Sequence, residues 1–262
     1  MDVRVDGYRV GVSTGGRPFD PARPTAVLVH GAGMDRTVWA FQARSLAAHG
    51  LSVLAVDLPG HGESEGPPLP TVTGIGDWLA RVIAAAGLAR AALAGHSMGA
   101  AAALECAARH PDRVRTLALV AVSEAMPVNP ALLAAAHDDV GAAIAMMVGF
   151  SLGPAAHLAS AVPGLWTPAL AERVLAAAPR GALGTDLAAC AAWSSGAESA
   201  LRERCPTLLV LGAADRMTPP KAGRALAARI PGAVVETVPD AGHLLMQEAP
   251  DAVSALLRAR FG

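Results

Sequence analysis

The residues best suited to chemistry lie in the segment Gly-His-Ser-Met-Gly at 95–99, where a serine stands between two glycines. A short apolar run precedes this segment, and an alanine-rich stretch with helical character follows it. A strand that passes directly into a helix through so tight a turn strains the middle residue and lifts its side chain out of the sheet. Glycine is needed on both sides because a side chain there would meet the crossing strand or helix. The pattern therefore predicts Ser97 as a nucleophile; the alternative is a chance match in a chain with 27 glycines.

A serine hydroxyl is a weak nucleophile at neutral pH and needs a histidine base that is held by a carboxylate. Of the eight histidines, His243 has the most suitable setting, in a turn between the strand-like run 233–238 and the last predicted helix. A loop at the carboxyl end of a strand lets a side chain reach over a parallel sheet. We therefore predict His243 as the base of Ser97, the alternative being an ordinary loop histidine.

The carboxylate is expected at the end of another strand. Residues 207–211 form a run typical of a buried strand, and the turn that leaves this run ends at Asp215. The competing acid is Glu124, just past the apolar run 117–122, because some folds of this kind place the acid one strand earlier. We predict Asp215 as the acid that orients the imidazole of the base and stabilises its protonated form.

A tetrahedral intermediate also needs N–H donors for its oxyanion. The strand-like run 27–29 passes into a glycine-containing loop at 30–35, upstream of the serine motif. We predict that the backbone N–H groups of Ala32 and of Met98, the residue after the nucleophile, form this oxyanion hole. Gly33 takes the place of Ala32 if the loop register differs by one residue. The alternative is a glycine-rich turn without a chemical role.

The elements that must position these residues alternate between strand-like and helix-like lengths. An N-terminal hairpin is predicted at about 2–13, and further strands begin near residues 26, 52, 91, 114, 207 and 233. Strands that alternate with helical segments favour parallel βαβ units. Between 125 and 196 the pattern changes, because prolines divide the segment into short helices and no strong strand signal is present. This segment is therefore expected to be an insertion in a core made of 1–124 and 197–262.

These motifs in this order resemble the α/β-hydrolase superfamily. The resemblance rests on five segments that together span nearly the whole chain: 30–31, 57–64, 95–99, 212–215 and 242–243. The order serine, acid, histidine is also that of the superfamily. The resemblance implies an α/β fold with a mostly parallel eight-stranded sheet, helices on both faces and a small helical cap inserted after strand 6. A serine at position 97 argues against dehalogenase and epoxide-hydrolase chemistry, since the superfamily uses an aspartate there for those reactions.

The expected cap contains a stretch, 140–171, without any Asp, Glu, Lys or Arg. Glycines and prolines interrupt this stretch, and no apolar run in it approaches the ~18 residues that a membrane span needs. We interpret it as an apolar cap that faces an apolar pocket. The side chains expected to line that pocket are Met146, Met147, Phe150 and Trp166. For each of them, packing between cap helices is the alternative.

Composition narrows the class of protein and its partners. With 53% hydrophobic and 16% charged residues among 262, the chain has enough apolar material for a large core. A net charge of −1 gives no electrostatic reason to expect nucleic acid or an anionic membrane as a partner. Three cysteines without metal-ligand spacing favour a reducing compartment, and the first residues show no secretory signal pattern. We expect a cytoplasmic enzyme without a bound metal, as a monomer or homodimer.

The residues predict a cofactor-free serine hydrolase that cleaves a small, largely apolar carboxylic ester, lactone or thioester through an acyl-enzyme. A carbon–carbon-bond hydrolase, a perhydrolase and an acyltransferase stay open because they use the same three side chains. A binding protein that has lost turnover on a hydrolase scaffold is the alternative outside the enzymes. The intact set of Ser97, Asp215 and His243 weighs against that alternative, so a small-molecule substrate is the expected partner.

Overall fold

A seven-stranded sheet runs through the middle of the molecule, and the computed structural model describes every residue of the chain, 1–262. The strand order is β3-β5-β4-β6-β7-β8-β9; β3 is antiparallel to β5, and all other neighbours are parallel. A two-stranded antiparallel sheet, β1-β2, lies outside it. The strands are β1 (Val3–Val5), β2 (Tyr8–Val10), β3 (Val12–Ser13), β4 (Thr25–Val29), β5 (Ser52–Val56), β6 (Ala91–His96), β7 (Val114–Val120), β8 (Thr207–Gly212) and β9 (Val234–Val238).

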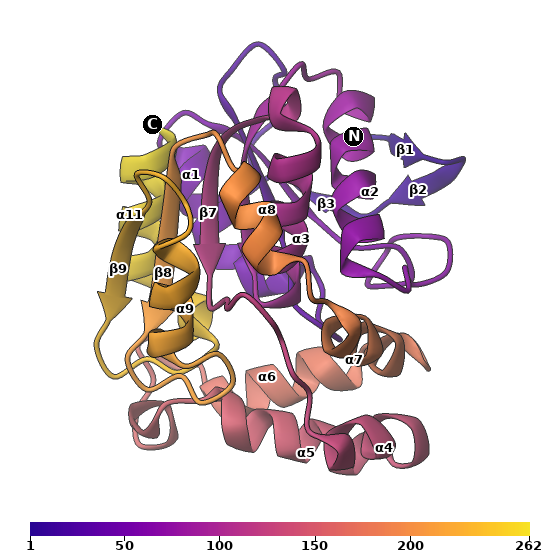
Figure 1. Cartoon of the computed structure of the whole chain (residues 1–262), viewed down its shortest axis with the longest axis vertical. Helices are drawn as coiled ribbons and strands as arrows, with labels where there is room; N and C mark the ends of the chain where they lie inside the picture. Colours follow the sequence, from indigo (N-terminus) through magenta and orange to yellow (C-terminus); the bar gives the residue numbers. More distant parts are fainter.

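Helices cover both faces of the sheet (Figure 1). On one face α2 packs on α3, α3 on α8 and α8 on α9, whereas α1 and α11 pack together on the other. The α-helices are α1 (Ala40–Ala48), α2 (Val72–Ala85), α3 (Met98–Arg109), α4 (Pro130–Asp138), α5 (Val140–Ser151), α6 (Thr167–Ala176), α7 (Ala182–Ala192), α8 (Gly196–Arg202), α9 (Pro220–Ala227), α10 (Leu245–Glu248) and α11 (Pro250–Phe261). Three short 3₁₀ helices are η1 (Arg36–Trp39), η2 (Pro111–Arg113) and η3 (Pro154–His157).

The central strands of the sheet are apolar except at their ends, and their sequences do not alternate between apolar and polar residues. Every residue of β4, β5, β6 and β8 is buried. A parallel strand with helices on both faces has no solvent-facing side, so both of its faces must be apolar. The edge strand β9 is covered less, and its burial alternates along the chain. The parallel order brings the carboxyl ends of β4, β6, β8 and β9 to one edge of the sheet.

Helices α4 to α7 separate β7 from β8 in the chain and gather at this edge, where the arrowheads of β7 and β9 point (Figure 1). They fall within the segment 125–196 for which the sequence predicts a cap, and the exact limits of that cap stay a prediction. The next helix, α8, begins at Gly196 and packs on α3 in the core. The insertion follows β7, which is the sixth strand of the sequence-based count because the count did not separate β3 from the N-terminal hairpin.

The α/β fold class is confirmed, with seven strands in the main sheet where eight were expected. The difference arises at the N-terminus, where the chain leaves the hairpin at Gly11. The Gly11 carbonyl accepts the Asp57 N–H, and its own N–H donates to Ser64 Oγ. Only the two residues of β3 therefore reach β5, and the hairpin packs against α2.

No helix is long and apolar enough to cross a membrane. The uncharged stretch 140–171 is divided among α5, η3 and the first half of α6. Backbone breaks at Leu152 and at Gly164, which has a φ of +79°, separate these pieces.

Candidate active site

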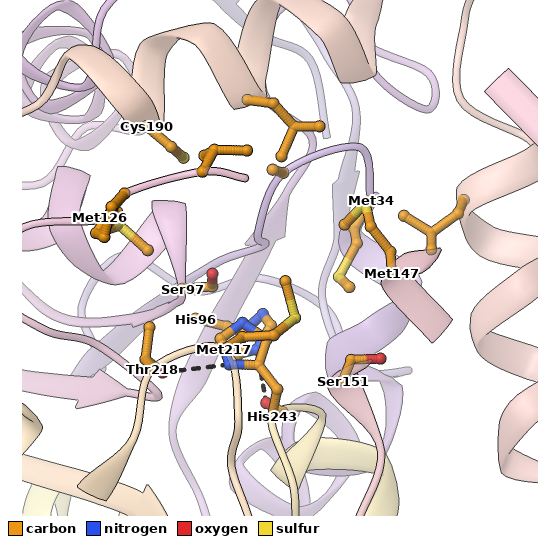
Figure 2. A pocket seen from close by; sticks show the side chains of 15 residues that line it. Met34, His96, Ser97, Met126, Met147, Ser151, Cys190, Met217, Thr218 and His243 are labelled. Carbon is orange, nitrogen blue, oxygen red and sulfur yellow. Dashed lines mark hydrogen bonds between the residues drawn. The ribbon is translucent and has the colours of Figure 1, made fainter. Parts of the chain in front are cut away.

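Ser97 lies in the one-residue connection between β6 and α3, in a backbone conformation that side chains rarely adopt. Its φ is 53° and its ψ is −119°. The turn stays this tight because of the two glycines: a Cβ at Gly95 would collide with the backbone of Gly99, and a Cβ at Gly99 would collide with the carbonyls of Val29 and His30. A strained residue that the surrounding structure holds in place is typical of a functional position. The Ser97 side chain points from this turn into a cavity at the sheet edge (Figure 2).

His243 lines the same cavity (Figure 2). Asp215, which follows the neighbouring strand β8, holds its imidazole. The Nδ1 atom of His243 lies 2.9 Å from Asp215 Oδ2, and both side chains are buried. The other carboxylate oxygen accepts N–H groups of Met217 at 2.8 Å and Thr218 at 2.9 Å. Burial raises the pKa of Asp215, but His243 and the Thr218 bonds outweigh it and hold that pKa below its usual value. Asp215 therefore stays ionised and orients the imidazole.

Two residues that sequence reasoning missed complete this arrangement. Thr218 Oγ1 donates to Asp215 Oδ2 at 2.8 Å and lies 3.2 Å from His243 Nδ1. Glu248 accepts the N–H groups on both sides of His243, those of Gly242 at 2.9 Å and Leu244 at 3.0 Å. The spacing Asp-x-x-Thr, typical of a side-chain turn, was a usable signal for Thr218. Nothing in the local sequence distinguishes Glu248, the last residue of α10, from an ordinary helix residue.

The loop from β4 brings Ala32 to the same cavity. The Ala32 N–H has no acceptor in the protein, whereas the Gly33 N–H donates to Asp186 Oδ2 at 2.8 Å. Met98 is the first residue of α3, so its N–H has no acceptor within that helix. Of the two loop residues considered from the sequence, Ala32 therefore has the available donor.

The cavity beside Ser97 is about 60 Å³ and has a mainly apolar wall. Four methionines contribute to it: Met34, Met126, Met147 and Met217. A second cavity of about 230 Å³ shares Pro127, Val128, Met147, Leu187 and Met217 with the first. We call the cavity beside Ser97 the inner cavity and the second one the outer cavity. The lining of the inner cavity contains no Lys, Arg, Asp or Glu, and that of the outer cavity contains one residue of these four types, Arg216.

The four cap side chains expected at the pocket occupy three different places. Met147 lines the inner cavity, together with Ser151 one helical turn further along α5. Met147 also lines the outer cavity, whereas Met146 and Phe150 line the outer cavity alone. Residues one position apart on a helix point about 100° away from each other, so Met146 turns away from Ser97. Trp166 is absent from both linings and is 49% exposed. The structure thus brings one of the four to Ser97 and places Trp166 away from it.

Glu124, the competing acid, lies outside the site. Its side chain is 37% exposed and forms an ion pair with Arg229 at 2.6 Å. It is absent from the lining of the cavity that contains Ser97 and His243.

Two other histidines at the site are buried without charge. Burial lowers the pKa of His30 to about 3, with a further lowering by His61, and burial also lowers the pKa of His96 to about 3, helped by His243. The Nε2 atom of His96 lies 2.9 Å from the His243 carbonyl oxygen, and its Nδ1 atom has no partner. Neither of these two histidines is suited to be the base, because neither gains a proton readily.

These two histidines are expected to make folding sensitive to acid. Both pKa values are about 3 when folded, below the ordinary 6.5, so between these limits the unfolded chain binds protons that the folded chain does not. Stability is then lost as pH falls below 6.5, and each histidine contributes a loss of about 1.4 kcal/mol between pH 7.5 and 5.5. Urea unfolding at these two pH values measures the loss.

The matched variant for this test is His30→Gln, which removes one of the two groups. It is expected to lose about 1.4 kcal/mol less than the wild type over the same pH interval. This difference isolates His30 from His61, whose pKa is raised by Asp186 against the lowering effect of burial and which acts in the opposite direction. Equal losses in the two proteins would contradict the assignment.

Comparison with known proteins identifies the family. The profile of the alpha/beta hydrolase family matches residues 26–256, and the chain belongs to this family. Pimeloyl-[acyl-carrier protein] methyl ester esterase of Chromobacterium violaceum is 34% identical over 89% of this chain and 92% of its own length. Among solved structures, the enol-lactonase of Burkholderia xenovorans LB400 is 25% identical with a TM-score of 0.87, covering 97% of this chain and 96% of that one. A hydrolase of Pseudomonas aeruginosa PA01 is 28% identical with a TM-score of 0.84, covering 99% and 97%. The protein is therefore a hydrolase of the α/β-hydrolase fold.

Proposed function

We propose that the protein is a serine hydrolase that cleaves a small, largely apolar carboxylic ester, or a lactone or thioester, through an acyl-enzyme and without a cofactor. The observation that carries the proposal is a single cavity lined by Ser97, His243 and Ala32, with His243 bonded to Asp215 at 2.9 Å. Similarity to an esterase and an enol-lactonase supports the class of substrate.

In the proposed mechanism, Asp215 fixes the tautomer of the base. Its ionised carboxylate accepts the Nδ1 proton of His243, which leaves Nε2 unprotonated. Nε2 takes the proton of Ser97 as the serine oxygen attacks the carbonyl carbon. The protonated imidazole then gives this proton to the departing alcohol, and His243 activates a water molecule that releases the acid.

The oxyanion that forms during attack is held by two backbone donors. In this proposal the N–H of Met98 follows the nucleophile in the chain, and the N–H of Ala32 comes from the loop after β4, the strand that pairs with β6. Donors that are fixed before the reaction need no reorganisation, and removing one from such a site costs on the order of 10²- to 10³-fold in kcat.

The two cavities support a substrate with a short apolar acyl group. The inner cavity of about 60 Å³ offers methionine and leucine side chains but no ionised partner from Lys, Arg, Asp or Glu. A charged group there would lose its water without replacement, which is costly. The outer cavity of about 230 Å³ has room for the other half of the substrate.

A panel of chromogenic esters tests this selectivity. We expect kcat/KM to rise from acetyl to roughly butyryl or hexanoyl esters, because each methylene that the apolar wall buries contributes up to ~0.8 kcal/mol, or about fourfold. For esters with longer acyl chains, kcat/KM should decrease because the cavity is already filled. Esters whose acyl chain ends in a carboxylate should be poor substrates, because the carboxylate would lose its water and the inner cavity has no basic side chain to replace it.

Lactones and thioesters of matched chain length belong in the same panel, because they separate the bond that is cleaved from the acyl group that is bound. A dicarboxylate monoester as the best substrate would show that the apolar cavity does not select the acyl group. No turnover of any ester, lactone or thioester would contradict the proposed function itself.

A further inference from the structure

Asp186 is a buried carboxylate in α7. It contacts the loop at 30–35 that carries Ala32, which we call the oxyanion loop. Its side chain is 1% exposed, and a single oxygen, Oδ2, accepts two hydrogen bonds. One comes from the Gly33 N–H at 2.8 Å and the other from His61 Nε2 at 2.9 Å. Asp186 therefore joins a helix of the inserted segment to two loops at the carboxyl ends of β4 and β5.

His61 holds the carboxylate in place. Its Nδ1 atom lies 3.0 Å from the Pro59 carbonyl oxygen, and its Nε2 atom lies 2.9 Å from Asp186. Both nitrogens thus face oxygen acceptors, an arrangement that favours the ring with a proton on each nitrogen. Burial lowers the pKa of His61, but Asp186 outweighs this effect and the pKa is raised overall. The result is a buried ion pair with a defined orientation.

The bond to Gly33 acts on the neighbouring residue, Ala32. Gly33 has a φ of +67°, and a Cβ there would collide with Leu183 on α7, so the loop passes close under this helix. Fixing the direction of the Gly33 N–H fixes the peptide plane between residues 32 and 33, and with it the path of the loop. The N–H of Ala32, which has no protein acceptor, stays available at the cavity.

We propose that Asp186 is a positioning residue for catalysis, because it holds the loop at Gly33 so that the Ala32 N–H faces the carbonyl attacked by Ser97. This role rests on the proposed serine-hydrolase function. Asp186 itself lies outside the lining of the Ser97 cavity and acts through the backbone. The inserted helices then contribute to transition-state stabilisation as well as to the pocket wall.

Glu105 offers a matched control within the same molecule. It is also a buried carboxylate, 2% exposed, and it contacts the C-terminal end of the inserted segment at Trp193. It accepts hydrogen bonds from Trp193 Nε1 at 2.8 Å, from Ser199 Oγ at 3.0 Å and from Ser195 Oγ. Glu105 makes no hydrogen bond to the oxyanion loop. A purely structural role for such anchors predicts similar effects at Glu105 and Asp186.

The experiment compares the steady-state kinetics of single variants at Asp186 and Glu105 with those of the wild type, using the best ester of the panel. Asp186→Leu removes the acceptor and should lower kcat about 10- to 100-fold with KM within about threefold, since a misdirected oxyanion donor stabilises only the transition state less. Asp186→Asn keeps an oxygen acceptor and should stay within about threefold of the wild type. Glu105→Leu makes the corresponding change at a carboxylate that has no hydrogen bond to the loop, and its kcat should stay within about threefold of the wild type. The affinity for an alkylboronic acid, which forms a tetrahedral serine adduct, should fall in parallel with kcat.

The double variant His61→Leu/Asp186→Leu covers the case in which Asp186→Leu does not fold. It removes both charges together, and replacing a buried ion pair by apolar side chains is often tolerated. Its kcat should still be 10- to 100-fold low. A folded double variant with kcat within threefold of the wild type would overturn the proposal, as would an equal kcat loss in Glu105→Leu or a change confined to KM. Ser97→Ala is measured alongside: activity in that variant would overturn the proposed function instead.

Discussion

Replacing Ser97 with alanine is expected to lower kcat by roughly 10⁴- to 10⁶-fold while the protein keeps its fold. The covalent route disappears because alanine has no oxygen to attack the carbonyl. The strained backbone is unaffected by the loss of one atom, since the tight turn is set by Gly95 and Gly99. Hydrolysis of the best ester of the panel measures the loss, and thermal unfolding of both proteins verifies the fold.

Ser151→Ala is the matched control, because Ser151 is a second serine in the lining of the same cavity. Its hydroxyl bonds only the Val148 carbonyl, at 3.4 Å, so the variant should stay within tenfold of the wild type. A fluorophosphonate should label the wild type and Ser151→Ala but not Ser97→Ala. Hydrolysis by Ser97→Ala within tenfold of the wild type would refute the nucleophile.

Asp215→Asn is expected to lower kcat by up to ~10⁴-fold. The carboxylate oxygen Oδ1 accepts two backbone N–H groups, so the amide oxygen of asparagine should take that place. The amide NH₂ then faces His243 Nδ1 and donates to it, which leaves the ring proton on Nε2, where it faces the serine. His243 is held in place but in the wrong tautomer for a base.

Glu124→Gln is the comparison for Asp215→Asn, because Glu124 is the other acid that the sequence brought forward. Its partner is Arg229 in a partly exposed ion pair, and such pairs contribute ~0–1 kcal/mol to stability. Turnover of this variant should remain within about threefold of the wild type. If Glu124→Gln lost more activity than Asp215→Asn, the acid would be Glu124, which follows β7, one strand earlier than Asp215. Steady-state kinetics with one ester decides between them.

The arrangement of Ser97, Asp215 and His243 was predictable from sequence because each residue lies in the short connection that follows a strand-like run. Parallel strands bring their carboxyl ends to one edge of the sheet, so polar side chains in these connections come close together there. The five residues Gly95–Gly99 also carry their own conformation, since only glycine fits at both flanks. At these residues, the local sequence pattern and the position at the edge of the sheet indicate the same site.

The contacts that hold these groups were not predictable, because they join residues far apart in the chain. Asp186 lies 153 residues from Gly33 and 125 from His61, and no local periodicity encodes such a meeting. The prediction for the cap side chains did not distinguish the two cavities, for a different reason. The direction of Met146 or Met147 depends on the phase of α5, which its N-cap Asp139 and its packing determine, and composition alone does not give that phase.

The four methionines around Ser97 have a consequence for evolution as well as for binding. Thioether side chains are unbranched and have three rotatable bonds, so they fill gaps of different shapes at little energetic cost. A wall made of Met34, Met126, Met147 and Met217 can therefore re-form around related acyl groups without a change of backbone. Such a site accommodates new substrates before any mutation occurs, and it gives a duplicated copy of this enzyme a starting activity from which selection can specialise it.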